Sequence, residues 1–160
     1  MNEHEQLEQF MRRAIALATE NVESGRGGPF AALVVRDGRI VAECTNTVTT
    51  SCDPTAHAEI NAIRAACREL GVFQLSDCDL YTTCEPCPMC LGALYWARPR
   101  RVFYAATRDD AAAVGFDDAY IYDELGNDPH DRALPMQQLL RDEAQVSFSA
   151  WEAKQDRVEY

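Results

Sequence analysis

The chain has 160 residues, of which 47% are hydrophobic, and a formal net charge of −11 at pH 7. This length is typical of one domain with a core large enough to need no disulfide staples. The charge is uneven, because residues 109–160 hold 13 acidic side chains against 4 basic ones. Nucleic-acid binders normally present a basic face, so this balance disfavours RNA or DNA as a partner. The basic run Arg98-Pro99-Arg100-Arg101 is interpreted as a solvated lead-in to a strand.

The first residues are acidic and polar, without the basic and apolar regions of a signal peptide, and no apolar stretch reaches membrane-spanning length. We therefore expect a soluble cytoplasmic protein. Seven cysteines in such a compartment favour reduced thiols and a metal site over a disulfide framework. Four of them have no ligand spacing and are expected to be inert, buried or semi-buried thiols: Cys44, Cys52, Cys67 and Cys78.

The first half of the chain predicts a helix followed by a hairpin. Apolar residues at helical spacing predict an amphipathic helix over residues 2–22. Residues 30–35 and 40–44 then read as two strands joined by a turn at Asp37-Gly38. The double glycine Gly27-Gly28 has two interpretations. It either leaves room for a ligand to approach the backbone or simply ends the helix in a turn.

Helices and strands alternate further along the chain. A polar loop over residues 45–55 leads to a helix that Asp53 or Thr55 could cap, with Pro54 near its first turn and its end at Gly71. Residues 79–83 predict a third strand, Pro88 starts another helix, and residues 102–106 predict a fourth strand parallel to the third. This alternation indicates an α/β fold.

The last third of the chain is less regular. Residues 109–114 predict a short helix, residues 123–132 a loop, and residues 134–140 and 148–153 two short amphipathic pieces. On composition alone, this part is a solvated acidic appendage.

Two motifs thirty residues apart carry the chemistry. Thr55-Ala56-His57-Ala58-Glu59 supplies an imidazole and a carboxylate, and Pro86-Cys87-Pro88-Met89-Cys90 supplies two thiolates. Catalytic zinc sites usually have three protein ligands and leave the fourth position to water, whose pKa falls to about 7. The pattern predicts His57, Cys87 and Cys90 as zinc ligands, with Glu59 free to move protons. It is typical of the zinc nucleobase deaminases.

Cys84 leaves two other metal sites open. Together with Cys87 and Cys90 it has a spacing that also occurs in iron–sulfur ligation, although no fourth cysteine follows. As a fourth zinc ligand it would close the site and leave no place for water. A closed site would fit a zinc-stabilised interaction domain rather than an enzyme.

With these motifs, the chain resembles bacterial-type guanine deaminases of the cytidine-deaminase superfamily nearly end to end. The resemblance also includes Gly27-Gly28-Pro29-Phe30 and Gly115-Phe116-Asp117-Asp118. It implies a three-layer α/β/α sandwich around a mixed five-stranded sheet, whose fifth strand we place near residues 145–148. Residues 1–160 would then form a single zinc-dependent deaminase domain, with residues 119–160 as a C-terminal segment that caps the pocket.

The resemblance also assigns roles to single residues. His57, Cys87 and Cys90 would hold zinc, and Glu59 would shuttle protons. Further expected site residues are Asn46 as a hydrogen-bond partner of the purine, Phe30 and Phe116 against its ring, Asp118 beside the departing amino group, backbone groups around Ala58 and Glu85, and Tyr160 as part of the cap.

The implied reaction is hydrolysis of guanine to xanthine and ammonia by zinc-bound hydroxide, a step of purine salvage. A tRNA adenosine deaminase or a guanosine deaminase remains an alternative, because the two zinc motifs do not separate these enzymes. The resemblance further implies a homodimer, in which C-terminal segments could be exchanged between subunits.

Overall fold

The computed structural model describes residues 2–160 and divides the chain into two compact units that meet at the boundary between Asp118 and Ala119. Each unit is described by itself. The first contains a mixed sheet, and the second contains helices and turns.

Four strands make the sheet: β1 (Ala31–Arg36), β2 (Arg39–Thr45), β3 (Cys78–Cys84) and β4 (Arg101–Ala106). Their order is β2-β1-β3-β4, in which β1 is antiparallel to β2 and β3, while β3 and β4 are parallel. The β1–β2 turn has positive φ at both Asp37 and Gly38, as a two-residue hairpin turn with the right twist requires. All four strands and the parallel pairing predicted from the sequence are confirmed.

The predicted fifth strand is wrong, because residues 145–148 lie inside helix α7 (Arg141–Ala153). The sequence there has helical rather than alternating spacing: Ala144 and Phe148 are four residues apart, and Phe148 and Trp151 are three apart. Asp142 and Glu143 in the first turn also favour a helix start through its dipole.

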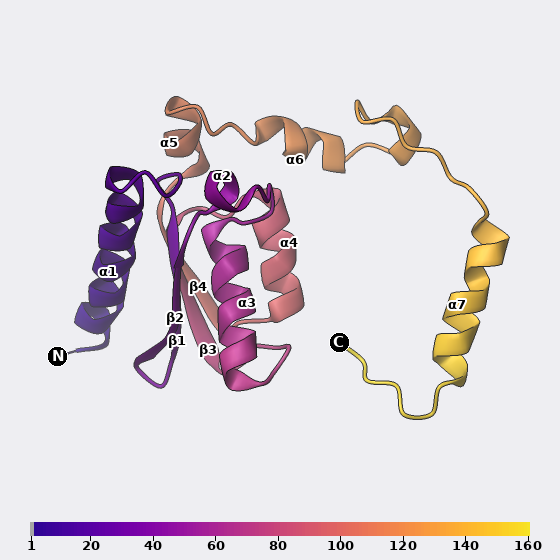
Figure 1. Cartoon of the computed structure of the whole chain (residues 1–160), viewed down its shortest axis with the longest axis horizontal. Helices are drawn as coiled ribbons and strands as arrows, with labels where there is room; N and C mark the ends of the chain where they lie inside the picture. The colour runs from indigo at the N-terminus through magenta and orange to yellow at the C-terminus, as the bar shows by residue number, and fades with distance from the viewer. Residues whose placement is uncertain (1) are drawn as a thin grey trace. The chain divides into compact units, whose positions relative to one another are not determined.

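Helices cover both faces of the sheet (Figure 1). On one face, α1 (Glu3–Glu23) packs against β1 and β3, and on the other lie α3 (Ala58–Leu70) and α4 (Pro88–Ala97). The alternation along β1 accounts for these two cores. Leu33 and Val35 pack with Tyr81 on the α1 face, whereas Ala32 and Val34 belong to the cluster under α3 and α4.

The helix boundaries follow their caps. Asn2 and Glu5 form a capping box at the start of α1, and Gly71 ends α3 in the left-handed conformation that glycine favours. The predicted caps of α3 are wrong: the helix begins at Ala58 with His57 at its N-cap position. Asp53 instead accepts hydrogen bonds from the backbone and hydroxyl of Thr55, which closes a turn ahead of the helix.

Two short helices complete the first unit, α2 (Val48–Ser51) and α5 (Arg108–Ala113). The second unit contains α6 (Ala119–Leu125), a 3-10 turn (Pro129–Asp131) and α7. The amphipathic piece predicted over residues 134–140 is not helical, whereas that over 148–153 is the second half of α7. In the described part of the chain, none of the helices has both the length and the apolar character needed to cross a membrane.

Candidate active site

Three predicted ligands come together where two helices begin. His57 precedes the first turn of α3, Cys87 occupies the N-cap position of α4, and Cys90 lies in the first turn of α4. The Nδ1 atom of His57 is 3.5 Å from Sγ of Cys87 and 3.5 Å from Sγ of Cys90. Within residues 2–160 these three side chains form one of the groups whose donor atoms lie close enough together to hold a metal ion.

The geometry of this group fits zinc. Tetrahedral coordination with a Zn–S bond of about 2.3 Å and a Zn–N bond of about 2.0–2.1 Å places a sulfur and a nitrogen ligand about 3.6 Å apart. The two observed separations of 3.5 Å match that value. One imidazole and two thiolates are also a donor set that zinc prefers, and they leave a fourth position for water.

The surroundings of Cys87 favour its thiolate form. The pKa of Cys87 is lowered to about 4, first by its side-chain hydrogen bond with Cys90 and, against the opposing effect of burial, also by His57. The backbone N–H of Cys90 also donates to Sγ of Cys87, at 3.4 Å. The pKa of Cys90 is raised, first by the same bond with Cys87 and then by burial. A cation held by His57, Cys87 and Cys90 would stabilise both thiolates.

Glu59 lies beside the ligands without belonging to their group. Its side chain is buried, and burial is the first cause that raises its pKa. The hydroxyl of Thr82 donates to Oε1 of Glu59 at 2.9 Å, and Sγ of Cys90 lies 3.5 Å from Oε2. The carboxylate is therefore held beside one of the candidate metal ligands, and its pKa is shifted upward, which is typical of a general acid or base in a buried site.

Cys84 is the last residue of β3 and lines the same cavity, but it is not in the ligand group found within residues 2–160. Its Sγ donates to the carbonyl oxygen of Thr107 at 3.5 Å. Burial is the first cause that raises the pKa of this thiol to about 11, so it stays protonated. This arrangement favours the open three-ligand site over the iron–sulfur and closed zinc sites. Of the four cysteines expected to be buried or semi-buried, Cys52 is instead exposed.

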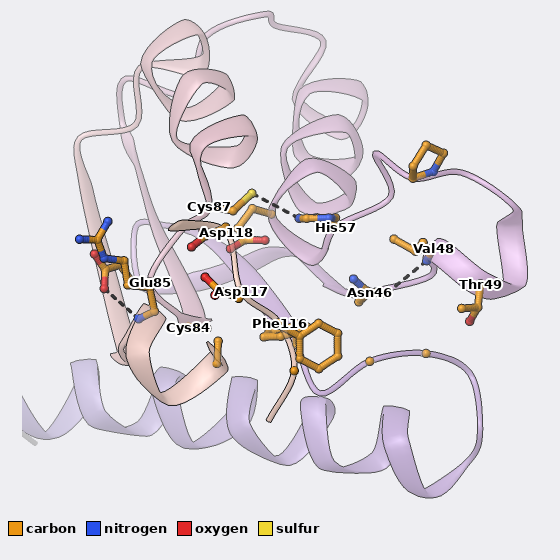
Figure 2. Close-up of a pocket in the computed structure, with 18 of the residues that line it drawn as sticks. Asn46, Val48, Thr49, His57, Cys84, Glu85, Cys87, Phe116, Asp117 and Asp118 are labelled. Atoms are coloured by element: carbon orange, nitrogen blue, oxygen red, sulfur yellow. Dashed lines mark hydrogen bonds between the residues drawn. The ribbon is translucent and has the colours of Figure 1, made fainter. Parts of the chain in front are cut away.

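A cavity of about 640 Å³ opens over the ligands, a size typical of small-molecule sites (Figure 2). Five predicted substrate or catalytic residues line it besides His57, Cys87 and Glu59: Phe30, Asn46, Glu85, Phe116 and Asp118.

The two phenylalanine rings of the cavity contact each other edge to face, with centroids 4.9 Å apart. They form an apolar wall against which a flat ring could pack. Asp118 is the last residue of the first unit. Burial is the largest cause that raises its pKa, and the charge of Cys87 raises it further, whereas a backbone hydrogen bond lowers it. Figure 2 shows Asp118 drawn beside Cys87 and His57.

Two predicted residues lie differently, and Glu85 has hydrogen-bond partners within the protein. The backbone N–H of Glu85 donates to the carbonyl of Ala106, and Oε2 of its carboxylate accepts from the N–H of Arg108. Ala58 is fully buried and is not a lining residue of the cavity. Tyr160 belongs to the second unit.

Thr82 is not among the residues predicted from the sequence, and the double glycine has two interpretations there. Thr82 carries no motif, but a polar residue two positions before Cys84 in a fully buried strand is a usable signal, because it shares Cys84's side of the sheet. A Cβ atom at Gly27 would lie 2.1 Å from the carbonyl oxygen of Asn46. The close approach that this glycine allows is therefore with the protein's own loop.

Comparison with known proteins agrees with this site. The family model of the cytidine and deoxycytidylate deaminase zinc-binding region matches residues 4–106. Guanine deaminase of Bacillus subtilis is 56% identical over 153 residues, which is 96% of this chain and 98% of that protein. Its crystal structure covers 100% of this chain with a TM-score of 0.94 and 54% identity. The tRNA-specific adenosine deaminase of Agrobacterium fabrum is 46% identical, but over 54% of this chain and 57% of that protein. The chain belongs to the zinc-binding cytidine and deoxycytidylate deaminase family.

Proposed function

We propose that this chain is a guanine deaminase, which hydrolyses guanine to xanthine and ammonia. The observation that carries the proposal is the extent of the similarity. The match to guanine deaminase of Bacillus subtilis spans both compact units, whereas the match to the tRNA-specific adenosine deaminase covers about half of the chain. The acidic balance of residues 109–160 also disfavours a polyanionic tRNA substrate.

His57, Cys87 and Cys90 would hold the zinc ion. When bound there, zinc supplies the positive charge that lowers the pKa of water to about 7. The remaining steps belong to side chains of this protein, and Glu59 is the first of them.

Glu59 takes a proton from the attacking water at its carboxylate while the water oxygen adds to C2 of guanine. It gives this proton to a ring nitrogen, then takes the second proton from the hydroxyl now attached to C2 and gives it to the leaving amino group, so that ammonia departs and the C2 oxygen remains in xanthine. Burial suits this shuttle, because it raises the pKa of Glu59 and lets the carboxyl group both accept and return a proton.

Substrate recognition is assigned to the cavity wall. The side-chain amide of Asn46 would hydrogen-bond the purine, and Phe30 and Phe116 would pack against its ring. Asp118 would assist the departing amino group. Its raised pKa favours a carboxyl group that can donate as well as accept a proton.

We propose that residues 119–160 cap the cavity with Tyr160 and that the protein is a homodimer, in which this segment could come from the partner. None of the residues of α7 is buried, although the helix carries Val146, Phe148 and Trp151. Apolar side chains that find no burial within their own unit need another surface to pack on. The free thiols of all seven cysteines suit a cytoplasmic enzyme of purine salvage.

The test is ammonia release from purified, zinc-loaded protein with guanine, guanosine, adenine, cytosine and a tRNA anticodon stem offered in parallel. Turnover of free guanine with little on the other substrates supports the proposal. Turnover confined to guanosine, or conversion of adenosine to inosine in the tRNA stem, would retain the zinc chemistry and refute the choice of substrate.

A further inference from the structure

Asn21 is a buried amide at the end of α1 nearest the candidate active site. It is 0% exposed and continues the stripe of α1 residues that face the sheet, after Ala14 and Ala18. Its Nδ2 group donates to the carbonyl oxygen of Gly28 at 2.9 Å and to that of Asn46 at 2.9 Å. One side chain of the helix thus joins two of the loops that line the cavity.

This amide is not explained by packing. Its Oδ1 atom is buried and has no hydrogen-bond partner within residues 2–160. An unpaired buried acceptor opposes folding, and an apolar side chain of similar size would avoid that cost. Departures of this kind from the rules of stable folding are concentrated at functional sites. The two donated hydrogen bonds are therefore the feature of Asn21 that calls for an explanation.

Gly27 meets the same carbonyl from another direction. A Cβ atom at this position would lie 2.1 Å from the carbonyl oxygen of Asn46 and 3.0 Å from Nδ2 of Asn21. The φ angle of Gly27 is not in the left-handed region, so alanine could adopt the same backbone conformation. What prevents a side chain here is the close contact with the loop of Asn46. The absence of a side chain at Gly27 lets the loop with Asn46 come close enough to bond Asn21.

Two more hydrogen bonds hold Asn46, one at its backbone N–H and one at its side chain. Its N–H donates to the carbonyl of Phe30 at 3.0 Å, and its side-chain Oδ1 accepts from the N–H of Val48 at 3.2 Å. These bonds orient the side chain so that Oδ1 is engaged, while Nδ2 has no hydrogen-bond partner within the described residues. The bond from Asn21 links this loop directly to α1.

We propose that Asn21 and Gly27 are positioning residues that fix the carbonyl of Asn46 and thereby aim its side-chain amide at the substrate. The proposal rests on the proposed function, in which Asn46 binds the purine. Neither residue is expected to touch the substrate's reacting atoms. Disturbing either one should weaken purine binding and leave the metal group and Glu59 intact.

The kinetic test compares Asn21→Leu, Gly27→Ala and the control Ala18→Gly with the wild type, each loaded with zinc. Ala18 lies one turn before the positioning residue on the same buried stripe, and glycine there destabilises the helix without a change at Asn46. KM for guanine should rise about tenfold in the first two variants, which corresponds to about 1.4 kcal/mol. The kcat should stay within about twofold and zinc content should be unchanged. A KM equal to that of Ala18→Gly in both variants would overturn the proposal.

A double-mutant cycle separates positioning from general destabilisation. In the Asn46→Ala background the side-chain amide is gone, so adding Asn21→Leu should change KM by less than about twofold. Additive effects of the two substitutions would mean that Asn21 does not act through Asn46.

Hydrogen exchange separates this proposal from the proposed function. The backbone N–H of Asn46, measured in substrate-free protein, should exchange faster in Asn21→Leu than in Ala18→Gly. If wild-type protein does not turn over guanine, the proposed function fails. The exchange rate of the Asn46 N–H still shows whether Asn21 positions the Asn46 backbone. Equal exchange in the two variants would refute this positioning.

Discussion

The hydrogen bond from the hydroxyl of Thr82 is expected to orient Glu59 and to set its pKa, and this expectation can be tested by substitution. The hydroxyl donates to Oε1 of Glu59 at 2.9 Å inside the protein, where Thr82 is 1% exposed and Glu59 is 6% exposed. Thr82→Val removes the donor and keeps the shape of the side chain. A hydrogen bond to a charged group contributes about 1.5–3 kcal/mol, so kcat for guanine should fall at least about tenfold.

The substitution also has a defined effect on pH dependence. The hydrogen bond from Thr82 lowers the pKa of Glu59 against the larger, raising effect of burial. Without that bond the pKa rises further, the basic form is reached only at higher pH, and the acidic limb of the kcat profile moves upward. Thr82→Ser, which restores the hydroxyl, should recover most of the rate.

Thr83→Val is the matched control on the same strand. The hydroxyl of Thr83 accepts a hydrogen bond from the N–H of Ala31 at 3.1 Å and has no bond to Glu59. The kcat–pH profile is measured by stopped or continuous assays of xanthine formation from pH 5 to 9. The acidic limb of the Thr83→Val profile should coincide with that of the wild type. If Thr82→Val and Thr83→Val give the same kcat and the same limb, the positioning of Glu59 by Thr82 is refuted.

Two further predictions concern stability and metal binding. Asp79 is buried, which opposes ionisation, but hydrogen bonds from Arg100 and Arg101 outweigh that effect and lower its pKa to about 2. Its stabilisation is therefore complete above about pH 4 and is lost as the pH falls toward 2. Asp79→Asn should cost about 2 kcal/mol in urea unfolding at pH 7 and much less near pH 2, and an equal cost at both pH values would contradict this. Cys84→Ser should retain one zinc per chain, measured by atomic emission, and should respond to a chelator as the wild type does, because Cys84 is outside the ligand group. Cys87→Ser should lose the zinc. Loss of zinc from Cys84→Ser would mean that the site has four ligands.

The zinc motifs could be placed from the sequence because each lies near a local helix signal. Pro88 marks the first helical position behind Cys87, and Gly71 marks where the helix after His57 ends. Both signals follow short-range rules and the structure confirms them, whereas the start of α3 predicted at Asp53 or Thr55 is wrong.

Other features depend on contacts between distant parts of the chain. In the sequence, Thr82 and Asn21 look like ordinary strand and helix residues. Their roles depend on partners that the fold brings to them: Thr82 contacts Glu59, which is 23 residues away, and Asn21 contacts Asn46, which is 25 residues away. The fifth strand near residues 145–148 failed for a different reason. It was placed by resemblance, while the local spacing around Phe148 favours the helix that the structure contains.

The most direct test of the account is Glu59→Gln, with zinc content and guanine turnover measured on the same preparation. Glutamine keeps the size of the side chain and can still hydrogen-bond Thr82, but it cannot carry a proton between water and the purine. We expect one zinc per chain in both proteins, xanthine and ammonia from the wild type, and a loss of kcat of at least about a thousandfold in the variant. Near-normal turnover by Glu59→Gln, or no turnover of guanine by zinc-loaded wild-type protein, would contradict it.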